Sequence, residues 1–182
     1  MTKVFRATGW LACALSVILL VAPLGCKRRK VRAQATVEEA PGLASTIHLG
    51  DPRMAAQIVS GLYGVENGAW RWSARRFAVV LRPPAGAAQK GAILRVKLTV
   101  PPVIAEKEKS VTLTATVAKS PLPPETYSKA GDYTFQRDVP ANLLTGSDPV
   151  RVDFELDKAL APSDADSREL GVVVLAIGLE SK

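Results

Sequence analysis

The 182-residue chain carries 24 basic and 17 acidic residues, for a formal net charge of +7 and a length typical of one domain. Seven of the basic residues and none of the acidic ones lie within the first 35 positions, so the rest of the chain is formally neutral. A neutral domain has no basic face that could release counterions from phosphates, which argues against nucleic acid as a partner.

The first 25 residues have the pattern of a secretory signal peptide. Lys3 and Arg6 form a charged start, residues 7–25 carry no charge, and residues 10–21 are nearly all apolar. The ending Leu-Gly-Cys resembles a bacterial lipoprotein leader, although Pro23 stands three residues before Cys26, where such leaders usually carry Leu. The resemblance implies cleavage before Cys26 and a lipid on that residue, which would anchor the protein to a membrane of the cell envelope.

Two other interpretations of this leader stay open. The uncharged stretch approaches the roughly 20 residues that a membrane-spanning helix needs, so it also fits an uncleaved single N-terminal transmembrane anchor. Five basic residues follow it and two precede it, which would favour a cytoplasmic C-terminal side. Residues 33–35 have the small-x-small form of an ordinary cleavage site, but five charges separate them from the apolar stretch.

Residues 26–48 predict a flexible tether, because a basic cluster and then mostly small or polar residues follow one another without apolar periodicity. A short helix is expected next, since Asp51 is a good N-cap and Pro52 suits the first helical position. Apolar residues at positions 55, 58, 59 and 62 would form its buried stripe, and Gly61 or Gly64 would end it. The predicted domain covers residues 49–182.

Farther along, apolar and polar residues alternate with a period of two, which is typical of half-buried antiparallel strands. This alternation predicts strands at residues 77–81, 92–100, 111–117, 133–135 and 150–156, and another near Trp70 and Trp72. Residues 170–179 are apolar on both faces, which indicates a central strand. Six to eight strands with no helical pattern between them predict an all-β fold, an antiparallel two-sheet sandwich of jelly-roll or immunoglobulin-like type with one short N-terminal helix.

The residues that usually carry catalysis are scarce. His48 is the single histidine and lies at the end of the tether, outside the predicted strands. Both cysteines, Cys13 and Cys26, precede the domain, so a thiolate metal site or a disulfide is not expected there. No phosphate loop or dinucleotide motif occurs, and no cofactor is expected. Glu66 and Asp166 could pair as carboxylates for glycoside hydrolysis, and Asp164 with Asp166 could bind calcium, but a solvated loop is the simpler interpretation.

The segment of residues 61–72 is the most distinctive, because it holds Tyr63, Trp70 and Trp72 close to Glu66 and Arg71. Aromatic rings beside charged side chains would suit a sugar. The CH groups of the sugar would pack on an indole ring, and its hydroxyls would form hydrogen bonds with the charged side chains. The structural interpretation is favoured: Trp72 would fill the core, and Glu66 would pair with Arg71 or another arginine.

Together with residues 166–174, this segment resembles a family of bacterial jelly-roll, galactose-binding-like modules associated with polysaccharide-assembly glycosyltransferases. Their pattern is Gly-x-Tyr-x-x-Glu, then Arg-Trp, and finally Asp-x-Arg-x-Leu-Gly-Val; Ser73-Ala74 here replaces the usual Thr-Gly. The resemblance implies a non-catalytic module over about residues 58–180. The positions that match its motif are Glu66, Arg71, Trp72, Asp166 and Arg168.

We therefore expect a non-catalytic, membrane-tethered β-sandwich of the cell envelope that binds carbohydrate or a partner protein. The candidate ligand-binding residues are Tyr63, Glu66, Trp70, Arg71, Trp72, Asp166 and Arg168. One alternative is a structural or assembly subunit of an envelope polysaccharide system with no small ligand of its own. A hydrolase that uses paired carboxylates is a third hypothesis.

Overall fold

The structure, a computed structural model, describes residues 42–145 and 148–182. The predicted signal peptide, Cys26 and most of the predicted tether lie outside the described residues. Within the described part of the chain, none of the helices has both the length and the apolar character that crossing a membrane requires. The prediction of an all-β fold is confirmed, and its strands are antiparallel.

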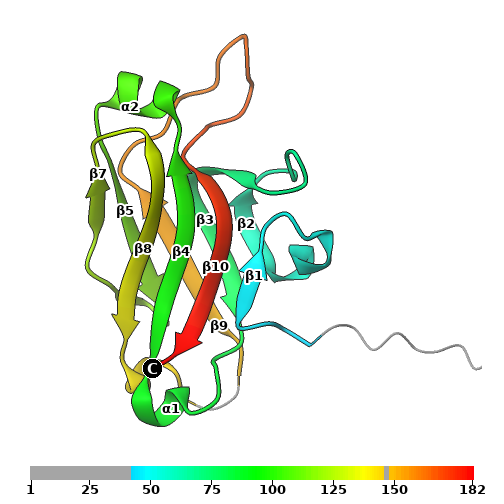
Figure 1. The fold of residues 1–182 in the computed structure, drawn as a ribbon, viewed down its shortest axis with the longest axis vertical. Helices are drawn as coiled ribbons and strands as arrows, with labels where there is room; N and C mark the ends of the chain where they lie inside the picture. The colour runs from blue at the N-terminus through cyan, green and yellow to red at the C-terminus, as the bar shows by residue number, and fades with distance from the viewer. Residues whose placement is uncertain (1–41, 146–147) are drawn as a thin grey trace, which may run out of the picture. The chain divides into compact units, whose positions relative to one another are not determined.

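The described residues form ten strands and four short helices (Figure 1). The strands are β1 (Thr46–His48), β2 (Ile58–Leu62), β3 (Arg71–Leu81), β4 (Ala92–Val100), β5 (Val111–Val117), β6 (Ser120–Pro121), β7 (Glu125–Tyr127), β8 (Gly131–Val139), β9 (Val150–Leu156) and β10 (Val173–Ser181). The helices are the 3-10 turns η1 (Pro52–Gln57) and η2 (Ala141–Leu143) and the α-helices α1 (Ala87–Lys90) and α2 (Pro102–Glu108).

All ten strands belong to one curled antiparallel sheet with the order β6-β5-β9-β3-β10-β4-β8. Strand β3 connects its two halves, because the start of β3 pairs with β10 and its end, from Arg76 to Leu81, pairs with β9. Strands β1, β2 and β7 add to β10, β3 and β5. In Figure 1, the curl places β8, β4 and β10 in front of β5 and β9. The run that is apolar on both faces, β10, is central as predicted.

Side chains close the curl where β7 approaches the free edge of β8. The rings of Tyr127 and Tyr133 lie 4.6 Å apart, and the Arg137 guanidinium pairs with Glu125 at 2.8 Å. Arg137 also donates hydrogen bonds to the carbonyl oxygens of Pro123 and Pro124. An edge strand with unpaired backbone groups invites association with other chains, and these contacts cover part of that edge.

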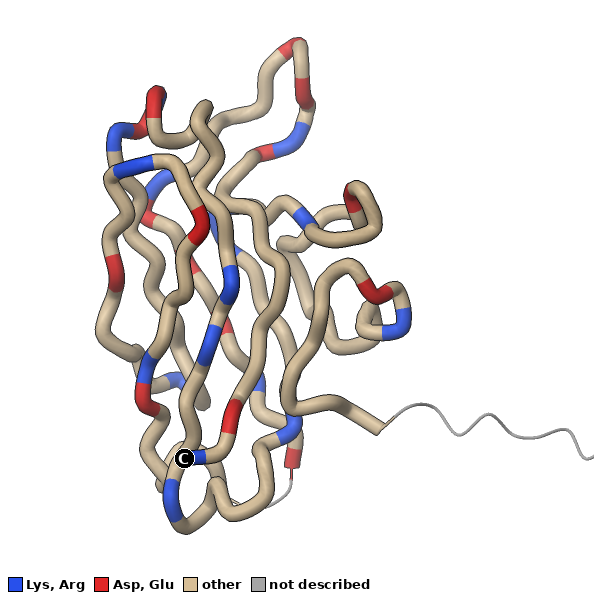
Figure 2. Tube along the Cα trace, in the orientation of Figure 1, with Lys and Arg blue, Asp and Glu red and all other residues tan. Residues whose placement is uncertain are grey.

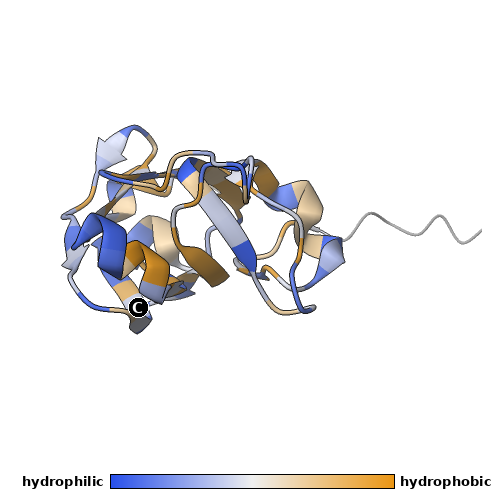
Figure 3. Ribbon diagram, turned by 90° about the horizontal axis from the view of Figure 1, so that it is seen from above, coloured by the Kyte–Doolittle hydropathy of each residue, from blue (hydrophilic) through white to orange (hydrophobic). Residues whose placement is uncertain are grey.

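The inward-facing residues of both halves make one apolar core. Every second residue of β4, β5 and β9 is buried, as the period of two predicted. Within this core, Phe77 on β3 stacks on Phe154 on β9 with ring centroids 4.7 Å apart. Ile104 of α2 is fully buried. Figure 3 views the molecule from above and shows the hydrophobic first part of this helix beside its hydrophilic second part.

The predicted end of the tether at residue 48 is wrong. Thr46–His48 forms β1, which pairs with β10, and the Ile47 side chain is fully buried in the core. His48 therefore lies in a strand and not outside the strand region, and its side chain is exposed. Three residues are too short a run to show a period of two, so no alternation marks this strand in the sequence.

The predicted N-terminal helix is correct at its start but not at its end. Asp51 caps η1 and accepts a hydrogen bond from the backbone of Arg53, and Pro52 follows it as expected. The apolar stripe at residues 58–62 instead belongs to β2, in which Gly61 has a φ of +70°. A Cβ at Gly61 would collide with the backbone of Arg76 on β3, so the glycine allows the close approach of β2. The absence of helices between strands was also a wrong prediction, since α1 and α2 occur there.

Candidate functional site

The structure brings most of the sequence-predicted site residues together at one end of the sheet. The loop between β2 and β3 meets the long loop between β9 and β10 there. The Arg168 guanidinium bridges two carboxylates: Nη1 donates to Glu66 at 2.9 Å, and Nη2 donates to Asp166 at 2.8 Å. The same guanidinium carbon lies 5.2 Å from the centre of the Tyr63 ring, at cation–π distance.

The two loops are connected by further hydrogen bonds of these residues. The Tyr63 hydroxyl donates to the carbonyl of Glu169 at 2.9 Å. Arg71 donates to the carbonyl of Tyr63 at 2.7 Å and to that of Leu49 at 3.0 Å. We call Tyr63, Glu66, Asp166 and Arg168 the loop latch, because their polar groups hold the two loops to each other. Arg71 instead connects the β2–β3 loop to Leu49, which follows β1.

The two tryptophans of the β2–β3 segment contribute backbone hydrogen bonds and apolar packing. Trp70 closes the turn after β2 by two backbone hydrogen bonds with Glu66. Trp72 is half-buried and packs against the core cluster. The neighbouring Ser73 is fully buried, and its hydroxyl accepts a hydrogen bond from the backbone of Val172 at 3.0 Å. The two segments that carry the family resemblance are thus packed on each other, and the Ser73 side chain joins them through its hydrogen bond with Val172.

Hydrogen bonds from Arg168 remove Asp166 as the acid of a Glu66–Asp166 couple. The side chain and then the backbone N–H of Arg168 donate hydrogen bonds to Asp166, which lowers its pKa to about 2. The two carboxylates raise the pKa of Arg168 in turn. A carboxyl group with so low a pKa is ionised at neutral pH and cannot serve as a proton donor. The expected pairing of Glu66 with an arginine is present, and the arginine is Arg168.

The calcium hypothesis at Asp164 and Asp166 receives no support from the geometry. Asp166 is engaged by Arg168, and Asp164 lies exposed in the loop between β9 and β10. Across residues 42–145 and 148–182, no group of three or more histidine, cysteine or acidic side chains is placed to hold a metal ion.

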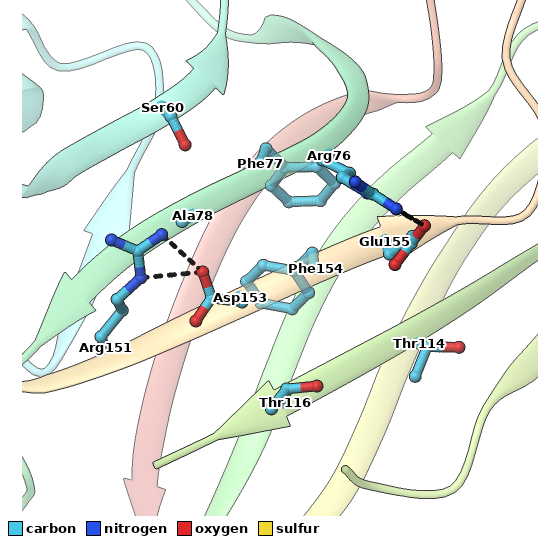
Figure 4. Close-up of a pocket in the computed structure, with 10 residues that line it drawn as sticks. All are labelled: Ser60, Arg76, Phe77, Ala78, Thr114, Thr116, Arg151, Asp153, Phe154 and Glu155. Carbon is cyan, nitrogen blue, oxygen red and sulfur yellow. Dashed lines mark hydrogen bonds and ion pairs between the residues drawn. The ribbon is translucent and has the colours of Figure 1, made fainter. Parts of the chain in front are cut away.

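A separate hollow of about 320 Å³ lies on the outer face of β2, β3, β9 and β5, and we call it the outer trough (Figure 4). Strand register places its polar side chains in cross-strand rows. The first row is Ser60, Ala78, Asp153 and Thr116, and the second is Arg76, Glu155 and Thr114. Ala78 is only 1% exposed, so the first row has a small residue between longer neighbours.

The charges of the outer trough balance. Arg76 pairs with Glu155 at 2.8 Å, and Arg151 pairs with Asp153 at 2.7 Å, all through half-exposed or exposed side chains. Figure 4 shows the two ion pairs on the same face as the hydroxyls of Thr114 and Thr116. The trough therefore offers hydrogen-bond donors and acceptors without net charge, an arrangement suited to a hydroxylated ligand.

Sequence reasoning missed the outer trough because its residues come from four strands that span residues 60 to 155. Alternation marked Thr114, Thr116, Asp153 and Glu155 only as the polar faces of strands. The adjacency of Thr116 and Asp153 depends on the register between β5 and β9, which one sequence does not give.

Comparison with known proteins gives no relatives for this chain. No protein-family model, no curated protein and no solved structure matches it.

Proposed function

We propose that this protein is a non-catalytic module of the bacterial cell envelope, tethered to a membrane by its N-terminus, that binds carbohydrate in the outer trough. The curled sheet is proposed to be a sandwich of the jelly-roll, galactose-binding-like type. The observation that carries the binding proposal is the outer trough itself, a charge-balanced polar hollow built on four paired strands.

The chemistry of the trough supports a neutral, polyhydroxylated ligand. Arg76 and Glu155 each keep hydrogen-bonding capacity beyond their mutual contact, because a guanidinium has five donor hydrogens and a carboxylate has four acceptor positions. Sugar hydroxyls both donate and accept, so they match such alternating groups. Since both arginines are already paired with acids, a ligand that carries its own charge gains little.

The non-catalytic part of the proposal draws support from the loop latch. Glu66 and Asp166, the carboxylates considered above for glycoside hydrolysis, both accept hydrogen bonds from Arg168. The ion pairs of the trough similarly occupy Asp153 and Glu155. The envelope location draws support only from the sequence of residues 1–26, through the apolar stretch and Cys26.

The test is a binding assay of the full-length protein in detergent micelles against an array of immobilised neutral and acidic polysaccharides. The variant that carries Thr114→Val and Thr116→Val removes two hydroxyls but keeps β-branched side chains in β5. It should weaken binding of a neutral polysaccharide roughly tenfold, because each lost hydrogen bond contributes about 0.5–1.5 kcal/mol.

Thr126→Val on β7 is the matched control, since Thr126 is an exposed strand threonine outside the outer trough. It should bind neutral polysaccharide like the unmodified protein. If no polysaccharide binds, or if the β5 variant binds as well as the control, the proposed function is wrong. Cellular crosslinking to one envelope protein would then support the alternative of an assembly subunit.

A further inference from the structure

The outer trough continues into a second hollow of about 470 Å³. The two hollows share part of their lining, because Arg151 and Asp153, the ion pair drawn in Figure 4, border both of them. The second hollow is also lined by the turn between β5 and β6, by Leu143 of η2 and by the residues that lead into β9. We call the outer trough and the second hollow together the long groove.

Strands β9 and β5 run side by side along the long groove. Asp153 lies opposite Thr116, and two residues farther along the strands the same face reaches Arg151 and Ala118. At about 3.4 Å per residue, residues 149–155 span about 20 Å of this surface. A single sugar ring does not fill such a length, whereas a chain of linked rings can follow it.

The charges of the second hollow balance, as those of the outer trough do. Its basic residues are Lys119 and Arg151, and its acidic residues are Asp148 and Asp153. Arg151 pairs with Asp153, whereas neither Lys119 nor Asp148 has an ion-pair partner in the part of the chain that the structure describes. Figure 2 shows basic and acidic positions interspersed along the trace in the same way. The long groove therefore favours a neutral chain whose hydroxyls both donate and accept hydrogen bonds.

The turn between β5 and β6 has a strained backbone. Ala118 and Lys119 have φ angles of +48° and +68°, a region that glycine adopts more easily than residues with a side chain. A two-residue turn of this kind normally prefers Asn and Gly. Strained residues are concentrated at functional sites. Lys119 lines the second hollow, and its ammonium group has three donor hydrogens.

We propose that the long groove binds several consecutive units of a linear neutral polysaccharide, and that Lys119 donates hydrogen bonds to sugar hydroxyls in the second hollow. This inference rests on the proposed function, because it names the class of glycan that the outer trough takes. Leu143 and Val150, which pack partly buried against the core, offer apolar surface to the CH groups of the same sugar units. A single terminal sugar would use the outer trough alone.

The experiment measures binding of linear oligosaccharides of two and six units to the full-length protein, in micelles of a detergent without a sugar headgroup. The probes are neutral oligomers of glucose, mannose, xylose and N-acetylglucosamine, and isothermal titration calorimetry gives the dissociation constants. The hexamer of the bound sugar should bind at least about tenfold more tightly than its dimer, because it adds hydrogen bonds and apolar contacts in the second hollow.

Substitutions of Lys119 test whether the longer chain reaches the second hollow. Lys119→Ala should weaken hexamer binding about threefold and leave dimer binding unchanged, because only the hexamer extends to this side chain. Lys119→Gly should give the same loss and should also raise the melting temperature, since glycine relieves the strain of the turn. Lys109→Gly is the matched control. Lys109 is another exposed lysine with a positive φ, +64°, and it lines neither hollow, so both affinities should stay unchanged.

Equal affinities for dimer and hexamer, or a loss from Lys119→Ala no larger than that from Lys109→Gly, would overturn the long groove. The proposed function would survive that outcome if the variant with Thr114→Val and Thr116→Val still weakened dimer binding. Failure of every probe to bind would also overturn the long groove, and the polysaccharide array would then decide whether the proposed function falls with it.

Discussion

Gln57 holds the chain at the point where the described residues enter the sheet, and its removal is the clearest test of the fold. The side chain is only 4% exposed. Its amide oxygen accepts from the backbone N–H of Ala44 at 2.8 Å, and its amide nitrogen donates to the carbonyls of Ala44 at 3.0 Å and Val80 at 2.8 Å. The predicted perturbation is Gln57→Leu, which keeps the size and removes all three hydrogen bonds.

The size of the effect follows from the groups that lose a partner. The Ala44 carbonyl keeps the hydrogen bond from Arg82, so two backbone groups are left unsatisfied: the N–H of Ala44 and the carbonyl of Val80. Each unsatisfied buried group costs about 1–3 kcal/mol, and the buried leucine returns about 1–2 kcal/mol. The free energy of unfolding should therefore fall by about 2–3 kcal/mol.

Urea unfolding of the full-length protein in micelles, followed by tryptophan fluorescence and circular dichroism, measures this change. Gln136→Leu on β8 is the control, because Gln136 is exposed and should change the free energy of unfolding by less than about 0.5 kcal/mol. If Gln57→Leu is as stable as this control, Gln57 does not fix the entry of the chain, and the position of β1 beside β10 is in doubt.

Three further predictions concern the loop latch and the β2–β3 contact. Arg168→Ala should lower the melting temperature by roughly 5 °C, because two partly exposed ion pairs and the Tyr63 contact are lost; an unchanged melting curve would contradict the latch. Asp166→Asn should lower the melting temperature at pH 7 but not near pH 2. The pKa of about 2 in the folded protein lies below the ordinary value, so the stabilisation is complete above about pH 4 and disappears as the pH falls through 2; melts across that range check it. Gly61→Ala should destabilise the protein by more than about 2 kcal/mol in urea unfolding, because of its positive φ and the collision with Arg76, whereas a Gly64→Ala control, with open space at the Cβ position, should have little effect.

The sequence predicted the long strands well, because their alternation reflects burial on one face only. The predicted strand of residues 92–100 coincides with β4, and those of residues 111–117 and 150–156 coincide with β5 and β9. Short elements were missed because they contain too few residues for an alternation to be recognised. Strands β1, β6 and β7 have three residues or fewer, and the apolar residues of β2 fitted a helical stripe as well as a strand. Helix α2 begins at Pro102, although the sequence indicated the two prolines at 101 and 102 only as the end of a strand.

The sequence predicted that Glu66 forms an ion pair with an arginine, but it did not identify the correct arginine. Glu66 beside Arg71 suggested an ion pair, but the partner is Arg168, a residue 102 positions away in the chain. The outer trough depends on strand register. Alternation alone does not specify which polar residues of β3, β5 and β9 become neighbours.

Amide chemical-shift mapping by NMR of the full-length protein in micelles, titrated with a neutral oligosaccharide from the array, is the most direct test of carbohydrate binding by the outer trough. Shifts concentrated at Ala78, Thr116 and Asp153 are the predicted result. Shifts confined to the loop latch around Tyr63 and Arg168, or no shifts with any oligosaccharide, would contradict it.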